Sequence, residues 1–251
     1  MQRYEISSTV LRVAVFAYAI YELKNFIGCL TDPLYNQTIK IVTNSRECIR
    51  VVNTLRTHCQ EHPILGLDCE WVSERGRRYP VALLQLATHR GFCALFRLCE
   101  MRRIPSELRN LLNDPSILKV GVAPDVDANY LEEDYNIRVI RTLDLRHLAR
   151  DSGFPWPYGM ANLAKNALGI TMDEDGTISA SDWESSDLTD RQIKYAANDA
   201  HVAVELFEVL AKRFVSRGSF TSQRDWLERV MKCVEYCIDQ PFVDTSIVFK
   251  T

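Results

Sequence analysis

Two acidic side chains stand two residues apart inside a hydrophobic segment of the chain. Asp68 and Glu70 occur in the run ILGLDCEW, residues 64–71, which follows Pro63 and is otherwise largely apolar. Such a run predicts a buried strand, and side chains two apart on a strand point to the same face. Carboxylates side by side and partly out of water repel each other, so a divalent cation or a shared proton must compensate them. The pair therefore predicts a site rather than an ordinary surface.

Further acids occur at the starts and faces of predicted helices. Asp127 follows a short apolar segment and lies, with Asp125, in the first turn of a predicted helix. An acid at that position can simply cap the helix. Tyr195 and Asp199 are four residues apart on a long predicted helix and share a face that is otherwise apolar. A buried hydrogen-bonding role for Asp199 is the alternative to a ligand role.

Taken together, these residues favour phosphoryl chemistry. A strand Asp-x-Glu, a helix-start Asp and a helical Tyr-x-x-x-Asp occur in that order, at positions that can meet at one end of a sheet. Four carboxylates in one pocket would bind two hard cations through oxygen, which suits Mg²⁺ or Mn²⁺. Such a pair of ions stabilises the attacking and leaving oxygens of a phosphoryl displacement, and the tyrosine hydroxyl can hold the attacking water.

The elements that must position these residues alternate in type along the chain. An antiparallel meander of three strands is followed by strands alternating with helices, which predicts an α/β domain with a mixed sheet. The expected strands are 39–43, 64–71, 81–87, 92–96, 118–122 and 139–143, and the expected helices are 45–60, 105–112, 125–135, 145–150, 161–168 and 188–214. Residues 153–159 and 170–187 are expected to be loops, and 225–239 an amphipathic helix.

Composition bounds the function only loosely. The chain has 251 residues, 47% of them hydrophobic, which suits one sizeable domain or one domain with an appendage. A net charge of -3 neither indicates nor excludes a nucleic-acid partner. Local basic groups matter more, and Arg75, Arg77 and Arg78 either contact phosphates or lie in a solvated loop. Gln85 makes a core hydrogen bond or contacts substrate. Asp144 ends a strand near the site and is expected either to support the site residues from behind or to cap an element.

Cysteine usage and the N-terminal segment bear on the compartment. The eight cysteines form no CxxC pattern and mostly lie in apolar runs, so reduced, structural thiols are expected. Residues 13–21 are wholly apolar, but Arg12, Glu22 and Lys24 interrupt the length that a spanning helix needs. A packed helix, a membrane anchor and a targeting segment all remain open for this region.

Five motifs carry a resemblance to a known family. They are LGLDCEWV (65–72), PVALLQLAT (80–88), KVGVAPDVDANYL (119–131), GMANLAKNALG (159–169) and YAANDA (195–200). Their order and contexts resemble the DEDDy family of 3′–5′ exonucleases, which includes RNase D and the Werner-type exonuclease. The resemblance runs from about residue 39 to 213. It implies an RNase H-like mixed sheet and a metal-dependent hydrolysis that releases nucleoside 5′-monophosphates from single-stranded or 3′-ended DNA or RNA.

The resemblance also implies a role for each site residue. Asp68 is expected to bridge both metals, and Glu70 and Asp199 to complete the tighter metal site. Asp127 is expected to support the second metal through water, and Tyr195 to orient the nucleophilic water. Asp125 is the second acid of this motif and is not expected to support a metal. Ala123-Pro124 departs from the glycine-containing turn that is common in the family.

Domain organisation and location follow from the same resemblance. Residues 1–38 are expected to be an apolar segment and linker, 39–214 the exonuclease domain, and 215–251 a helical extension. The motifs are most similar to the subgroup of exonuclease 3′–5′ domain-containing protein 2, whose members carry an apolar mitochondrial anchor. Membrane association through residues 9–30 and a mitochondrial location are therefore expected, with nucleus or cytoplasm as the alternative. An inactive nuclease-fold module that binds nucleic acid or protein, and a phosphodiesterase acting on small esters, remain as alternative functions.

Overall fold

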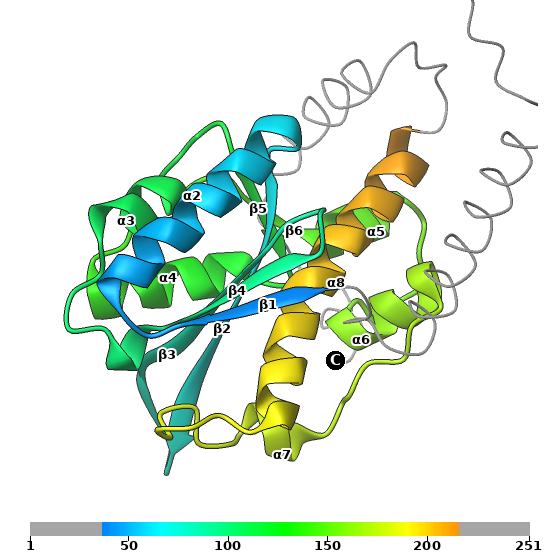
Figure 1. Cartoon of the computed structure of the whole chain (residues 1–251). Helices are drawn as coiled ribbons and strands as arrows, with labels where there is room; N and C mark the ends of the chain where they lie inside the picture. Colours follow the sequence, from blue (N-terminus) through cyan, green and yellow to red (C-terminus); the bar gives the residue numbers. More distant parts are fainter. Residues whose placement is uncertain (1–36, 216–251) are drawn as a thin grey trace, which may run out of the picture.

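A six-stranded mixed sheet forms the centre of the molecule, with helices on both of its faces (Figure 1). The computed structural model describes residues 37–215. The strands are β1 (Thr38–Val42), β2 (Ile64–Glu74), β3 (Arg77–Ala87), β4 (Phe92–Arg97), β5 (Leu118–Gly121) and β6 (Thr142–Asp144). The helices are α2 (Ser45–Glu61), α3 (Ser106–Leu112), α4 (Pro124–Tyr135), α5 (Leu145–Asp151), α6 (Met160–Leu163), α7 (Gly176–Ser179) and α8 (Asp190–Val215), with short turns at Leu98–Glu100 (3₁₀) and Ala164–Leu168 (π).

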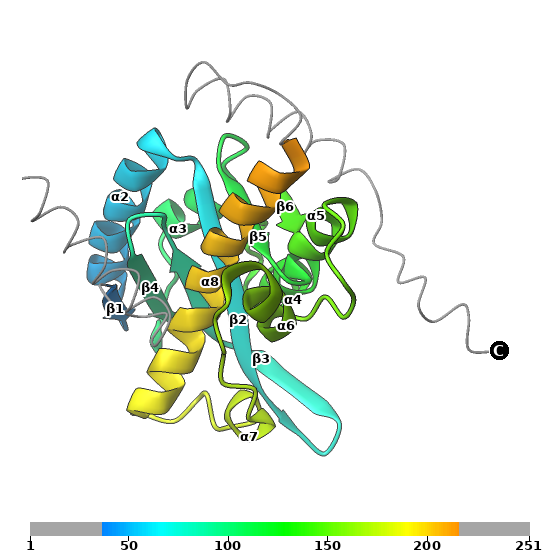
Figure 2. The same cartoon turned by 90° about the vertical axis from the view of Figure 1, so that its right-hand side faces the viewer.

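The strand order confirms the predicted mixed sheet. The order is β1-β4-β3-β2-β5-β6, with β2, β3 and β4 paired antiparallel as the expected meander. The outer pairs β1–β4, β2–β5 and β5–β6 are parallel. In this register Asp68 of β2 lies directly opposite Gln85 of β3. The β2–β3 hairpin extends beyond the rest of the sheet, which Figure 2 shows at its lower end.

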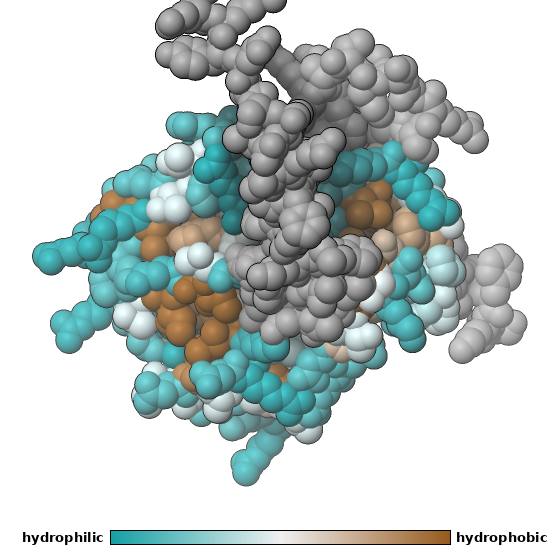
Figure 3. Space-filling view, turned by 45° about the vertical axis from the view of Figure 1, so that its right-hand side comes forward, coloured by the Kyte–Doolittle hydropathy of each residue, from teal (hydrophilic) through white to brown (hydrophobic). Residues whose placement is uncertain are grey.

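The two faces of β2 pack against different helices because successive side chains alternate. Leu65, Leu67 and Cys69 share a core with the buried side of α2, which includes Val52 and Leu55. The opposite face, which carries Asp68 and Glu70, lies toward α8. The described surface in Figure 3 is largely hydrophilic, with hydrophobic residues gathered in separate patches.

A glycine allows α8 to approach β2 closely. A Cβ atom built on Gly66 would lie 1.8 Å from the carbonyl oxygen of Ala200, a distance that no side chain can occupy. Only a residue without a Cβ therefore permits this approach. Because Gly66 precedes Asp68 by two residues and Ala200 follows Asp199, the contact sets how near the acids of the strand and the helix come.

Some element boundaries differ from the sequence prediction. The strand expected at 139–143 begins only at Thr142, because Arg141 has a φ of 59°, which interrupts the extended backbone. The helix expected at 161–168 divides into α6 and the π-turn that follows it. The loop expected at 170–187 contains the short helix α7, whose first turn is capped by the Asp175 side chain accepting from the Thr177 amide.

The remaining sequence predictions concern thiols and the ends of the chain. Within residues 37–215 the cysteines are unpaired, and Cys48, Cys59, Cys69 and Cys93 are buried. None of the helices in this part of the chain is long and apolar enough to cross a membrane. The predicted anchor or packed helix at 9–30 and the predicted helix at 225–239 lie outside the described residues.

Candidate metal centre and its cleft

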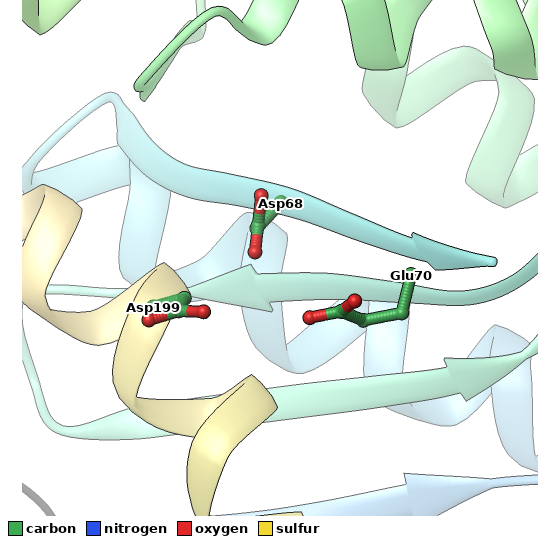
Figure 4. A group of neighbouring side chains, drawn as sticks. All are labelled: Asp68, Glu70 and Asp199. Atoms are coloured by element: carbon green, nitrogen blue, oxygen red, sulfur yellow. The ribbon is translucent and has the colours of Figure 1, made fainter. Parts of the chain in front are cut away.

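Three carboxylates converge where β2 meets α8. Asp68 and Glu70 project from β2 and Asp199 from α8, and Figure 4 shows the three side chains turned toward one another. Each offers an oxygen atom such that all three atoms lie within 4.8 Å of one another. Glu70 is buried, and Asp68 is partly exposed. The pairing of two strand acids with one helix acid could not be read from local periodicity alone.

The electrostatics of this cluster call for a compensating charge. Burial raises the pKa of Asp68 to about 7. Burial, and then the charges of Asp68, Asp199 and Asp127, raise the pKa of Glu70 far above its ordinary value. The pKa of Asp199 is also raised, first by burial and then by Asp68. Each ionised carboxylate is thus unfavourable beside the others, and a divalent cation bound by their oxygens would reverse that balance.

Asp127 lies beside this cluster without belonging to the group of three. It is buried in the first turn of α4, and its pKa is raised by burial and by the charge of Asp68. The N-cap position of α4 is Ala123, and no side chain caps the helix there. Asp127 is therefore not the N-cap, whereas Asp125 is exposed to solvent.

The turn before α4 keeps the shape that a glycine would give it. Ala123 has a φ of 56° and a ψ of 42°, in the left-handed region. An alanine in this conformation costs roughly 1–2 kcal/mol. The departure from the family pattern at Ala123-Pro124 therefore leaves the turn in place and introduces local strain.

The Tyr195 hydroxyl is hydrogen-bonded to Asp199. This bond lowers the pKa of Asp199, although burial outweighs it. Burial and the neighbouring carboxylates raise the pKa of Tyr195, so its hydroxyl stays protonated at neutral pH and donates to the carboxylate. The side chain is half-buried and lies at the edge of the cleft.

An open cleft of about 470 Å³ gives access to the cluster. Trp71 lines the cleft and also packs edge-on against Tyr130, with ring centroids 4.9 Å apart. The lining residues are Asp68, Cys69, Glu70, Trp71, Ser73, Val122, Met160, Ser179, Ala180, Tyr195 and Asp199. The sequence analysis did not identify Met160, Ser179 and Ala180 as a wall of the cleft. Asp175, followed two residues later by Thr177, was the local pattern that could have predicted the helix α7, which ends at Ser179.

Other candidate residues lie in different places. Gln85 is fully buried opposite Asp68 and does not line the cleft. Neither of its amide atoms has a hydrogen-bond partner within the described part of the chain. Of the two roles predicted for Asp144, the structure shows the capping one, since its carboxylate accepts from the Arg146 amide at the start of α5. Arg75 and Arg77 are exposed at the tip of the hairpin.

Arg78 has a structural partner in the tertiary fold. It donates to both carboxylate oxygens of Asp134, at 2.6 and 2.9 Å, and its guanidinium lies 3.9 Å from the centre of the Tyr130 ring. Asp134 also accepts from the Val81 amide. These contacts attach the hairpin to α4, so Arg78 does not lie in a free, solvated loop.

A mixed sheet with an open cluster of carboxylate donors is an arrangement that could hold a divalent cation of the kind that many hydrolases use. The sequence profile described as 3′-5′ exonuclease matches residues 39–214. The chain belongs to this 3′–5′ exonuclease family.

Relatives with known names agree with this assignment. Exonuclease 3′-5′ domain-containing protein 2 of Drosophila melanogaster is 49% identical over 162 residues, which cover 64% of this chain and 28% of the relative. The Homo sapiens protein of the same name is 36% identical over 81% of this chain and 35% of the relative. The chain thus spans about a third of the length of these curated relatives. Escherichia coli RNase D, 24% identical with a TM-score of 0.63 over 82% of this chain and 52% of that structure, shows the same fold.

Proposed function

We propose that this protein is a metal-dependent 3′–5′ exonuclease that hydrolyses terminal phosphodiester bonds of DNA or RNA and releases nucleoside 5′-monophosphates. The observation that supports this most is the convergence of Asp68, Glu70 and Asp199 within 4.8 Å at the base of an open cleft. The donor set consists of carboxylate oxygens alone, which fits Mg²⁺ or Mn²⁺. Membership of the 3′–5′ exonuclease family supports the direction of the reaction.

We assign the carboxylates to two cation sites. Asp68 would serve both, Glu70 and Asp199 would complete the first, and Asp127 would support the second through water. Bound cations would stabilise the charge on the attacking and leaving oxygens of the phosphoryl displacement. The burial of Glu70 and Asp127 keeps these side chains in place before substrate arrives.

Tyr195 would position the attacking water. Its hydroxyl is neutral at pH 7, as that of an ordinary tyrosine is, and the raised pKa extends this to higher pH. The hydroxyl donates its hydrogen bond to Asp199. The lone pairs of the same oxygen can accept a hydrogen bond from a water molecule in the cleft. The residue thus orients the nucleophile while it contributes no charge of its own.

Replacing Tyr195 with phenylalanine should lower the rate and leave cation binding almost unchanged. The substitution removes the hydroxyl but retains the ring, which lies 6.3 Å from the Trp183 ring, centroid to centroid. Misplacement of a reacting group, here the attacking water, can cost about 10²-fold in rate. Oligonucleotide shortening gives the rate, and the Mn²⁺-dependent rise in melting temperature gives the binding. If Mn²⁺ raises the melting temperature of the variant much less than that of the wild-type protein, the water-positioning role is contradicted.

The proposed function is tested by a panel of matched DNA and RNA strands. Each is labelled at its 5′ end, has a free or blocked 3′ hydroxyl, and is incubated with the wild-type protein in Mg²⁺ or Mn²⁺. A ladder that shortens from the free 3′ end, with mononucleotide 5′-phosphates as products, is the expected result. Binding of the strands without shortening in either metal would favour the inactive module. Hydrolysis of small phosphodiesters with intact oligomers would favour the small-ester alternative.

A further inference from the structure

The β2–β3 hairpin ends in a tight turn that holds two arginines beyond the cleft. Glu74 pairs with Arg77 across the strands, so Arg75 and Gly76 alone form the turn. Their φ angles are 51° and 78°, both left-handed, as a type I′ hairpin turn requires. The twist of this turn type matches the twist of the strands. The backbone therefore sets the direction of the hairpin, and the tip is not a loose loop.

The three arginines of this hairpin differ in their partners. Arg78 is compensated by Asp134 and by Glu133, at 3.2 Å. Arg75 and Arg77 are exposed, and neither forms an ion pair with any residue from 37 to 215. The Arg77 guanidinium lies 5.4 Å from the centre of the Tyr79 ring. The turn thus places two arginines at the tip of the hairpin, where Glu74 lies opposite Arg77 in the strand register but forms no ion pair with it.

A groove leads from the acidic cluster toward these arginines. The metal-centre cleft and a second groove of about 370 Å³ share Ser73 and Ala180 in their walls. Tyr79, on which Arg77 stacks, lines the second groove. Its other walls carry Glu74, Asp182 and Glu184, whose charges repel phosphate. The positive charges nearest to this groove on the hairpin are those of Arg75 and Arg77, which lie beyond Glu74 at the hairpin tip.

We infer that Arg75 and Arg77 bind the phosphates of the substrate strand upstream of the bond that is cut. This inference rests on the proposed function. The tip of the hairpin lies five residues beyond Glu70, which is about 17 Å along a strand. At the rise of about 3.4 Å per nucleotide of a stacked strand, this distance corresponds to at most about five nucleotides. A single-stranded 3′ end several nucleotides long reaches the tip, and a dinucleotide does not.

The test compares substrates of two lengths on the full-length protein. The variant Arg75→Asn with Arg77→Gln removes both charges, and the Asn-Gly turn that results is a favoured type I′ sequence, so the hairpin is preserved. Arg75→Lys with Arg77→Lys retains the charge. Arg46→Gln with Arg50→Gln is the matched control, because these exposed arginines lie on α2, which covers the opposite face of the sheet.

Length dependence of the rate is the first readout. For a single strand of about twelve nucleotides, kcat/KM should fall about 10-fold in the neutral variant, because two phosphates of the strand are no longer neutralised by an arginine. The rate on a dinucleotide should stay within about twofold, and the lysine variant should retain most of the rate on the long strand. An equal reduction of kcat/KM on both substrates in the neutral variant, or no reduction on the long strand, would overturn the inference.

Binding of the long strand by anisotropy in Ca²⁺ is the second readout. The slope of log affinity against log salt should become shallower by about 1.4, since each phosphate of a single strand that is no longer neutralised lowers it by about 0.7. An unchanged slope would overturn the inference even where the wild-type protein shortens strands normally. If the wild-type protein shortens no strand, the proposed function fails, and the binding slope still decides the role of the arginines.

Discussion

Replacing Asp199 with alanine is expected to abolish Mn²⁺-dependent shortening of a labelled oligonucleotide, with a loss of at least about 10³-fold. The substitution removes one of the three oxygen donors that lie within 4.8 Å of one another. It also removes the acceptor to which the Tyr195 hydroxyl donates. Asp68 and Glu70 remain on β2 but no longer have a partner from α8 to complete the site.

The same variant should be at least as stable as the wild-type protein without cations. Burial raises the pKa of Asp68 from 3.8 to about 7 and also raises that of Asp199, so between these pH values the folded state binds more protons than the unfolded state. The free energy of unfolding of the cation-free protein therefore falls as pH rises through this range. In the Asp199→Ala variant, which has one carboxylate fewer, the free energy of unfolding should fall less over this pH range. Thermal melts from pH 4 to 8 measure the difference.

Two measurements separate this effect from simple damage to the fold. Mn²⁺ should raise the melting temperature of the wild-type protein and have little effect on the alanine variant, because an ion that binds only the folded state stabilises it. Asp125→Ala is the matched control, since Asp125 is an exposed acid on α4. Full activity in the Asp199 variant would refute the metal-site assignment.

Replacing Gly66 with alanine is expected to lower both stability and activity strongly. The added Cβ would lie 1.8 Å from the carbonyl oxygen of Ala200 and 2.9 Å from its carbonyl carbon. Backbone atoms cannot yield as a flexible side chain does, so α8 must move away from β2. Overpacking of this kind costs about 1–3 kcal/mol and sometimes more. The displacement separates Asp199 from Asp68, and a misplacement of about 1 Å can cost about 10²-fold in rate.

Gly176→Ala provides the control for this substitution. Nothing lies within 4 Å of a Cβ at Gly176, which starts α7 with an ordinary backbone conformation. Its stability should stay within about 0.5 kcal/mol of the wild-type value. Urea unfolding and oligonucleotide shortening, measured on both variants, give the comparison. A Gly66→Ala protein with wild-type stability and activity would show that the approach of α8 to β2 does not hold the acids together.

These two variants distinguish two contributions to the same site. Asp199→Ala should remove activity without loss of stability, since the carboxylate is unfavourable in the fold until a cation compensates it. Gly66→Ala should reduce both together, since it acts on the packing that brings the acids into reach.

Local patterns in the sequence determined much of this arrangement. Alternation along a strand placed Asp68 and Glu70 on one face, and the spacing of four placed Tyr195 and Asp199 on one face of a helix. Both relations involve residues close in the chain, so the geometry of a single element decides them. The order of elements likewise predicted a mixed sheet with an antiparallel centre, which the structure confirms.

Relations between distant residues were decided by the tertiary structure alone. Asp68 and Asp199 meet because Gly66 lets α8 approach β2, and no local pattern records which helix lies against which strand. Arg78 differs from Arg75 and Arg77 because its partner Asp134 lies 56 residues away. Sequence therefore determined which residues share a face of one element, and packing decided which elements meet, because a contact between elements depends on the shapes of both surfaces.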